Sequence, residues 1–288
     1  MEISRINQFI RTVKKFYKEN KRDMPWRTDT NPYYVVVSEL MLQQTQVHRV
    51  TSKFNSWIKR FPNWQTLATA STKDVLQEWS GLGYNRRALF LKRIAEQITD
   101  SGKTKGVLPK TVEELTLLPG IGPNTAGSIL AFAFNIPYPF IETNIRSVYI
   151  HHFFAEIEKA EGKKACKKIS DTEILPLIEQ TLKNMSVAQN PREWYWALMD
   201  YGSFLKKSLP NPSRQSAHHV KQSKFEGSNR ELRSKILKLI MKQNMTSETL
   251  VKQFKKWPRE QVEKNVEALT KEGFIVKRKT IIKLFDII

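Results

Sequence analysis

The sequence predicts a mainly α-helical protein with a small mixed unit at its C-terminal end. Apolar residues recur at intervals of three and four along most of residues 1–205, which is the spacing of amphipathic helices. Near the other end, residues 274–284 alternate apolar and polar side chains, as a β-hairpin does. The 288 residues suffice for about two domains.

Charge and cysteine content narrow the functional class. Lys and Arg number 48 against 28 Asp and Glu, so the formal net charge is +20 and nucleic acid is the expected partner. A hydrophobic fraction of 40% excludes a wholly disordered chain. A single cysteine, Cys166, excludes a disulfide scaffold and any multi-cysteine metal site. The N-terminal residues contain no apolar signal region, so we expect a cytoplasmic protein.

Prolines and capping residues divide the large helical region into elements. The first predicted helix covers residues 3–19, and Pro25 and Pro32 interrupt the pattern. Residues 33–50 include a run of three valines typical of a strand, but later residues continue at helical spacing, so we expect one helix. Further helical patterns cover residues 51–60, 72–80, 84–101, 111–117, 127–134, 171–184 and 191–204.

Composition changes after this helical domain, residues 1–205. Residues 206–228 are rich in Pro, Ser, Asn, Gln and basic side chains, which is typical of a linker or extended arm. In the last segment, residues 229–288, three helical patterns precede the hairpin, and this is the order of a winged helix. It carries fifteen Lys and Arg against seven Asp and Glu. Nucleic-acid contact is favoured, and a solvated face on a protein-interaction module is the alternative.

The most specific local signal is the segment Leu118–Gly127. A helix ends at a tight turn containing Gly120 and Gly122, and Pro123 suits the first position of a new helix. Glycines allow positive φ and close backbone approach, and the first N–H groups of a helix lack partners within it. The segment therefore predicts a hairpin that binds phosphate without a charged side chain.

Further motifs flank this hairpin. In chain order they are Pro25-Trp26-Arg27, Pro32-Tyr33, Val37-Ser38-Glu39-Leu40-Met41-Leu42-Gln43-Gln44-Thr45-Gln46-Val47, Gly81-Leu82-Gly83-Tyr84, Asn144-Ile145-Arg146-Ser147-Val148 and Ala197-Leu198-Met199-Asp200-Tyr201-Gly202. Together they resemble the helix-hairpin-helix DNA glycosylases, and among these the MutY-type adenine glycosylases. The resemblance covers residues 5–205 and implies a glycosylase fold of two helical subdomains, followed here by the winged-helix-like unit.

The resemblance assigns three carboxylates to catalysis. Loss of a purine requires protonation of the departing base, which a carboxyl group with a raised pKa can perform, and the family acid matching Glu39 does this at adenine. An ion pair with a buried base is the alternative role for Glu39. Glu142 stands where the family has an Asp that stabilises the oxocarbenium-like transition state, and its longer side chain displaces the carboxylate by roughly 1.5 Å. Asp200 replaces a family Glu in the same pocket.

The resemblance also implies a set of DNA contacts. Asn124 stands where bifunctional members carry a Schiff-base lysine, so we expect a monofunctional hydrolase. Gln44 and Tyr84 match residues that wedge into the duplex beside the flipped base, with ordinary surface packing as the alternative. The complete predicted set is Arg27, Gln44, Thr45, Leu82, Tyr84, Gly120, Gly122, Asn124 and Thr125.

Two departures from the family concern cofactor and lesion recognition. Lys206 stands at the first of four family cysteines that bind a [4Fe–4S] cluster, so we expect no cofactor. His218 and His219 have no Cys or acid close in sequence, so we expect no metal site. The MutT-like domain through which the family recognises 8-oxoguanine is replaced by the winged-helix-like unit.

The sequence thus predicts a monofunctional DNA N-glycosylase of base excision repair that removes adenine opposite 8-oxoguanine or G and leaves an abasic site. We expect a monomer that acts on double-stranded DNA near the nucleoid, without membrane contact. Within the class, the alternative is a thymine or uracil glycosylase at G mismatches, since that sister family shares the hairpin. Outside it, the alternative is a non-catalytic DNA-binding protein, although retained carboxylates would repel phosphate.

Overall fold

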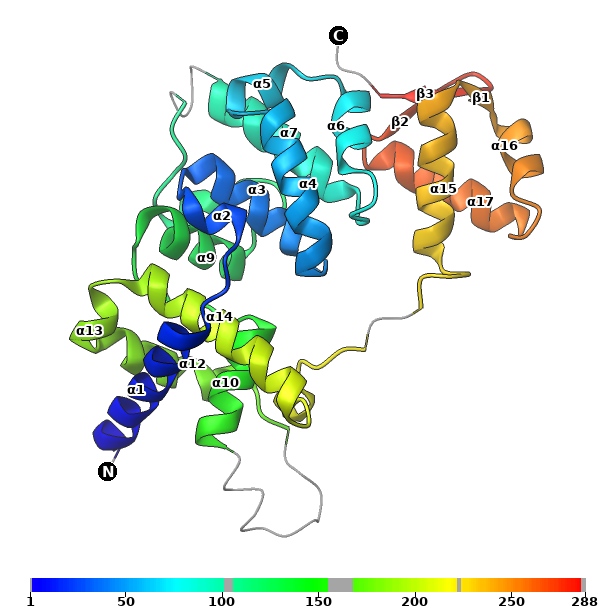
Figure 1. Cartoon of the computed structure of the whole chain (residues 1–288). Coiled ribbons are helices and arrows are strands. Elements are labelled where there is room, and N and C mark those ends of the chain that lie inside the picture. Colours follow the sequence, from blue (N-terminus) through cyan, green and yellow to red (C-terminus); the bar gives the residue numbers. More distant parts are fainter. Residues whose placement is uncertain (1, 101–105, 155–167, 222–223, 286–288) are drawn as a thin grey trace. The chain divides into compact units, whose positions relative to one another are not determined.

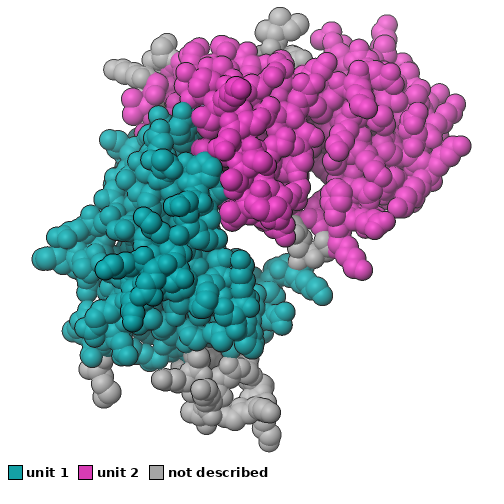
Figure 2. Space-filling model, viewed as in Figure 1, with its two compact units in different colours: residues 1–35, 109–221 teal, residues 36–108, 222–288 magenta. Residues whose placement is uncertain are grey.

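A computed structural model describes residues 2–100, 106–154, 168–221 and 224–285 (Figure 1). The chain divides into two compact units, each assembled from two separate stretches of sequence (Figure 2). Unit 1 comprises Met1–Val35 and Pro109–Lys221, and unit 2 comprises Val36–Leu108 and Gln222–Ile288. The sequential ranges 1–205, 206–228 and 229–288 stay a prediction about which parts fold independently. Cys166 lies outside the described residues.

The regular elements in the described part of unit 1 are helices, apart from one isolated β-bridge between Ile169 and Ser216. Its elements are α1 (Glu2–Asn20), α2 (Pro25–Thr28), the start of α3 (Pro32–Leu42), α8 (Val112–Leu115), α9 (Pro123–Phe134), α10 (Thr143–Phe153), α12 (Asp171–Lys183), α13 (Met185–Ala188), α14 (Pro191–Ser208) and the 3-10 helix η1 (Pro212–Gln215). The amphipathic pattern of α1 places Phe9 against an aromatic cluster from α10 and α14. This cluster forms part of the core of the unit.

Helices α10 and α14 approach closely because α14 carries a glycine at the crossing point. A Cβ atom on Gly202 would lie 2.3 Å from the backbone oxygen of Asn144, a distance that real Cβ atoms essentially never show. Any larger residue would push α14 away from the first turn of α10. Gly202 therefore allows α14 to lie close to the first turn of α10, and Glu142 directly precedes this helix.

Unit 2 combines the rest of α3 with helices from both stretches and a small sheet. Its helices are α4 (Val47–Arg60), α5 (Trp64–Thr69), α6 (Thr72–Trp79), α7 (Arg86–Thr99), α15 (Asn229–Lys242), α16 (Ser247–Gln253) and α17 (Arg259–Lys271). Strands β1 (Met245–Thr246), β2 (Ile275–Arg278) and β3 (Ile281–Leu284) form an antiparallel sheet in the order β1-β3-β2. Three helices with this sheet confirm the winged-helix-like prediction, and β1 adds a short third strand to the predicted hairpin.

Two predicted elements differ from the structure. Residues 33–50 do not form one helix, because α3 ends at Leu42 and α4 starts only at Val47. The break contains Gln44 at φ +55°, a left-handed conformation that cannot continue a helix. Within the predicted linker, α14 continues to Ser208 and Ser213 of η1 is buried, so this part is packed structure.

No helix in the described part of the chain combines the length and the apolar character needed to cross a membrane.

Candidate active site

The predicted hairpin is present in unit 1. Gly120 adopts φ +80°, which a residue with a side chain would reach only under strain, and Gly122 caps the start of α9. Pro123 occupies the first turn of α9, as its lack of an N–H and its fixed φ favour. Gly122 and Asn124 are exposed and Thr125 is half-buried. The hairpin therefore presents the first turn of α9 at the surface of its unit, as a phosphate-binding hairpin requires.

Asn124 connects this hairpin to the predicted catalytic carboxylate. Its side-chain oxygen accepts a hydrogen bond of 3.1 Å from the backbone N–H of Ile141, the residue before Glu142. A lysine at this position has no acceptor atom and could not make the bond. Asn124 therefore has a structural role of its own, because it holds the backbone at Ile141, directly before Glu142.

Glu142 occupies the N-cap position of α10 and is half-buried. Burial raises the pKa of its carboxyl group, and the positive charges of Arg146 and Lys206 act in the opposite direction. Burial also lowers the pKa of Lys206, and the carboxylate of Glu142 acts against that shift. Lys206, at the first family cysteine position, thus supplies a positive charge to the Glu142 site.

Arg146 and Asn144 complete the surroundings of Glu142. Arg146 donates two hydrogen bonds of 2.7 Å to the carboxylate of Asp171, which orients its guanidinium. The side-chain oxygen of Asn144 is buried and has no hydrogen-bond partner among the described residues. Buried acceptors are normally satisfied, so this oxygen is available to a donor from a bound ligand or water.

Asp200 is placed differently from a reactive carboxylate. It is 2% exposed, and each of its oxygens accepts hydrogen bonds from both Arg22 and Arg27 at 2.7–2.9 Å. Arg27 lies with its guanidinium 5.5 Å from the ring centre of Trp196. The ion pairs of Asp200 with Arg22 and Arg27 join α2 and the residues before it to α14. A structural role explains this geometry, and the predicted catalytic and DNA-contact roles of Asp200 and Arg27 stay predictions.

Unit 2 carries the third predicted acid, Glu39. It lies in the second half of α3 and is 9% exposed, and the nearby residues Val36, Val37 and Leu40 of this helix are fully buried. An acid in such a segment needs either a partner or a function. The other residues predicted for this unit, Gln44, Thr45, Leu82 and Tyr84, lie in two turns, before α4 and before α7.

A buried arginine that the sequence analysis did not single out holds these two turns. Arg87 is 5% exposed, and burial lowers its pKa to about 10, so it stays charged at neutral pH. It donates hydrogen bonds of 2.5–3.0 Å to the carbonyl oxygens of Leu40, Met41, Gln43 and Gly83 and to the hydroxyl of Thr45. Arg87 therefore satisfies carbonyls at the end of α3 and fastens the two turns to each other.

The turns themselves are conformationally unusual. Gln44 at φ +55° and Tyr84 at φ +47° are two of four described non-glycine residues with positive φ. Such conformations persist where the surroundings enforce them, often at functional sites. Gln44 is exposed and Tyr84 half-buried, whereas Leu82 is 2% exposed and packs inside the unit. The predicted DNA contact of Leu82 therefore has no support from its position and stays a prediction.

No group of three or more His, Cys, Asp or Glu residues that could hold a metal occurs in the described part of the chain. His218 has no acid close to it in the sequence, but in the folded chain its Nε2 lies 3.9 Å from the carboxylate of Asp171. That carboxylate is already bound by Arg146.

The hairpin and the helices around it define a DNA glycosylase fold of the helix-hairpin-helix class. Residues 37–171 match the model of the HhH-GPD superfamily of base excision DNA repair proteins. In the family that the sequence resembles, four cysteine thiolates hold a [4Fe–4S] cluster. Such a cluster does not fit this chain, because the chain has one cysteine.

The curated relatives of this chain include adenine DNA glycosylases. That of Buchnera aphidicola (subsp. Baizongia pistaciae) is 33% identical over 198 residues, which are 68% of this chain and 52% of the relative. That of Mycobacterium tuberculosis is 42% identical over 134 residues, 46% of this chain and 43% of the relative. The chain thus spans about half or less of the length of these relatives.

Solved structures show the same fold. A thermostable thymine-DNA glycosylase aligns with a TM-score of 0.55 at 21% identity, covering 69% of this chain and 87% of the other. An endonuclease III in a non-covalent complex with DNA aligns with a TM-score of 0.52 at 17% identity, over 71% of this chain and 85% of the other.

The ion pair of Asp200 yields a stability prediction. Asp200→Asn leaves two guanidinium groups without their carboxylate in a buried place, which should lower the free energy of unfolding by about 3 kcal/mol. Urea unfolding of the full chain measures this change. Glu263→Gln is the matched control, because its pair with Arg259 is exposed and should change stability by about 0.5 kcal/mol or less. Equal effects of the two substitutions would contradict the structural role.

Proposed function

We propose that this chain is a monofunctional DNA N-glycosylase that removes adenine mispaired with 8-oxoguanine or guanine in double-stranded DNA. The observation that carries the proposal is Glu142, a half-buried carboxylate at the start of α10 whose backbone is tied to the hairpin through Asn124. The names of the relatives at 33–42% identity support adenine as the base. The proposal includes action as a monomer and without an iron–sulfur cluster.

The proposed reaction uses the two carboxylates for different tasks. The bond between C1′ of the deoxyribose and N9 of adenine breaks, its electrons leave with the base, and a proton from Glu39 neutralises them. The ionised Glu142 stabilises the positive charge that develops on the sugar. Water adds to C1′, and the proton that it releases replaces the one lost by Glu39. The products are free adenine and an abasic site.

Asn124, Asp200 and Arg27 act in this proposal by positioning. Asn124 holds the residue before Glu142, and the Asp200 pair fixes α14, whose Gly202 contacts the start of α10. The absence of an amine at position 124 removes the Schiff-base route, so the phosphodiester chain stays intact after base loss.

The first test is a panel of duplexes that carry A, T, U or hypoxanthine opposite G, C or 8-oxoguanine. We expect excision of adenine opposite 8-oxoguanine and G, with strand breaks only after alkali. Under single-turnover conditions Glu142→Gln should reduce the rate constant about a hundredfold, as expected for loss of a charge that stabilises the transition state, with duplex binding retained. Glu142→Asp is the conservative control, because it keeps the charge.

Three outcomes would contradict the proposal. Excision of T or U opposite G, without excision of adenine, would identify the sister activity. Binding without excision of any base would make the chain a non-catalytic DNA-binding protein. Full activity of Glu142→Gln would remove the role of this carboxylate.

The electrostatics of Glu142 predict a pH dependence. Only its ionised form stabilises the sugar, so the single-turnover rate should fall as the pH drops through its raised pKa. The charge of Lys206 lowers this pKa, and Lys206→Met should therefore move the acidic limb of the pH–rate profile to higher pH. The neighbouring, exposed Lys207 provides the control Lys207→Met, which should leave the limb in place. An unmoved limb in Lys206→Met would contradict the coupling.

A further inference from the structure

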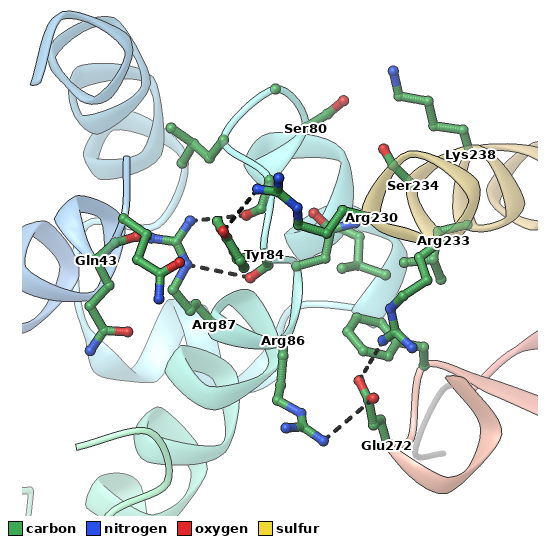
Figure 3. Close-up of a pocket in the computed structure, with 18 of the residues that line it drawn as sticks. Gln43, Ser80, Tyr84, Arg86, Arg87, Arg230, Arg233, Ser234, Lys238 and Glu272 are labelled. Carbon is green, nitrogen blue, oxygen red and sulfur yellow. Dashed lines mark hydrogen bonds and ion pairs between the residues drawn. The ribbon is translucent and has the colours of Figure 1, made fainter. Parts of the chain in front are cut away.

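Unit 2 contains a cleft of about 830 Å³ between α15 and the turn that precedes α7 (Figure 3). One wall consists of residues 80–87 together with Gln43 and Gln44. The other wall is formed by α15 residues, among them Arg230, Arg233 and Lys238. The cleft has the size of sites that hold drug-sized ligands or a nucleotide. Helix α15 lies outside residues 37–171, so this wall does not come from the region that matches the family.

The cleft carries a strong excess of positive charge. Its described lining includes the single carboxylate of Glu272, which forms ion pairs with Arg233 at 2.7 Å and Arg86 at 3.4 Å. Arg49, Arg230 and Lys238 add further positive charges to the same lining. Lys238 is exposed on the α15 wall. One carboxylate cannot balance these groups, so the cleft favours a polyanion.

Tyr84 joins the two walls. Arg230 of α15 donates a hydrogen bond of 2.9 Å to the hydroxyl of Tyr84, and its guanidinium lies 5.6 Å from the ring centre (Figure 3). Arg87 lies 5.5 Å from the same ring. The side chain predicted to wedge into a duplex is therefore positioned by α15, and a duplex that meets Tyr84 also meets the cationic residues of this helix.

We propose that this cleft binds the sugar-phosphate backbone of double-stranded DNA next to Tyr84. Lys238 and Arg233 contact phosphates, and Arg230 acts as a positioning residue for Tyr84. Serine hydroxyls and glutamine amides also line the cleft, and these groups together with Arg, Lys and Tyr are those that bind phosphate oxygens in protein–DNA complexes. The proposal rests on the proposed function for the role of Tyr84.

Salt-dependent binding of the full-length protein to a duplex with A opposite G tests the cleft. Lys238→Ala removes one phosphate contact, so the slope of log K against log salt should become shallower by about 0.9, and affinity at 0.1 M salt should fall roughly eightfold. Lys59→Ala is the matched control, because this exposed lysine of α4 lies outside the cleft lining and outside the winged-helix-like unit. Its affinity should stay within about twofold of the unchanged protein, at an unchanged slope. Equal effects of the two variants would overturn the proposal, because net charge alone would then explain binding.

Tyr84→Phe tests the positioning role, since it keeps the ring and removes the hydroxyl that Arg230 bonds. We expect an unchanged salt slope but reduced base extrusion, seen as a smaller fluorescence rise of 2-aminopurine placed beside the mismatch. Arg230→Ala should reduce the same signal and also weaken binding. Full extrusion in both variants would refute the positioning role. Thermal unfolding of each variant verifies that it is folded.

The two proposals can fail separately. If the unchanged protein excises adenine while Lys238→Ala and Arg230→Ala bind like Lys59→Ala, the cleft proposal is wrong and the proposed function stands. If the unchanged protein excises no base but its duplex binding depends on Lys238, the proposed function is wrong and the cleft stands.

Discussion

The hydrogen bonds of the buried Arg87 guanidinium are the interaction on which the turns before α4 and α7 in unit 2 depend. An arginine removed from water must replace its hydration with hydrogen bonds, and the carbonyl oxygens at the end of a helix need donors. Arg87 meets both requirements at once, because it bonds carbonyls of Leu40, Met41 and Gln43 and also the turn before α7. One side chain thus ends α3 and keeps Gln44 and Tyr84 in left-handed conformations.

In unit 1, several residues together hold Glu142 in position. No single residue holds this carboxylate in place; Gly202 lets α14 approach the start of α10, and Asn124 bonds the backbone before it. The ion pairs of Asp200 with Arg22 and Arg27 fasten the same helix α14. Close packing and polar contacts between segments distant in sequence thus hold the site residues of each unit. Arg230 of α15 adds one more such contact, its hydrogen bond to Tyr84.

Local signals explain which features could be predicted from the sequence. The hairpin was predictable because Gly120, Gly122 and Pro123 encode its turn within a few residues. The break after α3 was not, because it depends on Arg87, which lies 44 residues beyond Gln43. For the same reason the burial of Leu82 and the pairing of Asp200 were missed, since both depend on segments that meet only in the folded chain. The one sequence signal for this interaction was the position of Arg87, three residues after the Gly81-Leu82-Gly83-Tyr84 motif.

Hydrogen–deuterium exchange of Arg87→Lys against the unchanged protein tests most directly whether one guanidinium holds both turns. Lysine keeps the charge at neutral pH but lacks the fork of donors that reaches several carbonyls. We predict faster exchange in the Gln43–Gln46 turn and in the Gly81–Tyr84 turn together, with unit 1 unchanged. The exposed neighbour gives the control Arg86→Lys, which should leave both turns protected. Loss of protection in one turn alone, or in neither, would contradict the central role of Arg87.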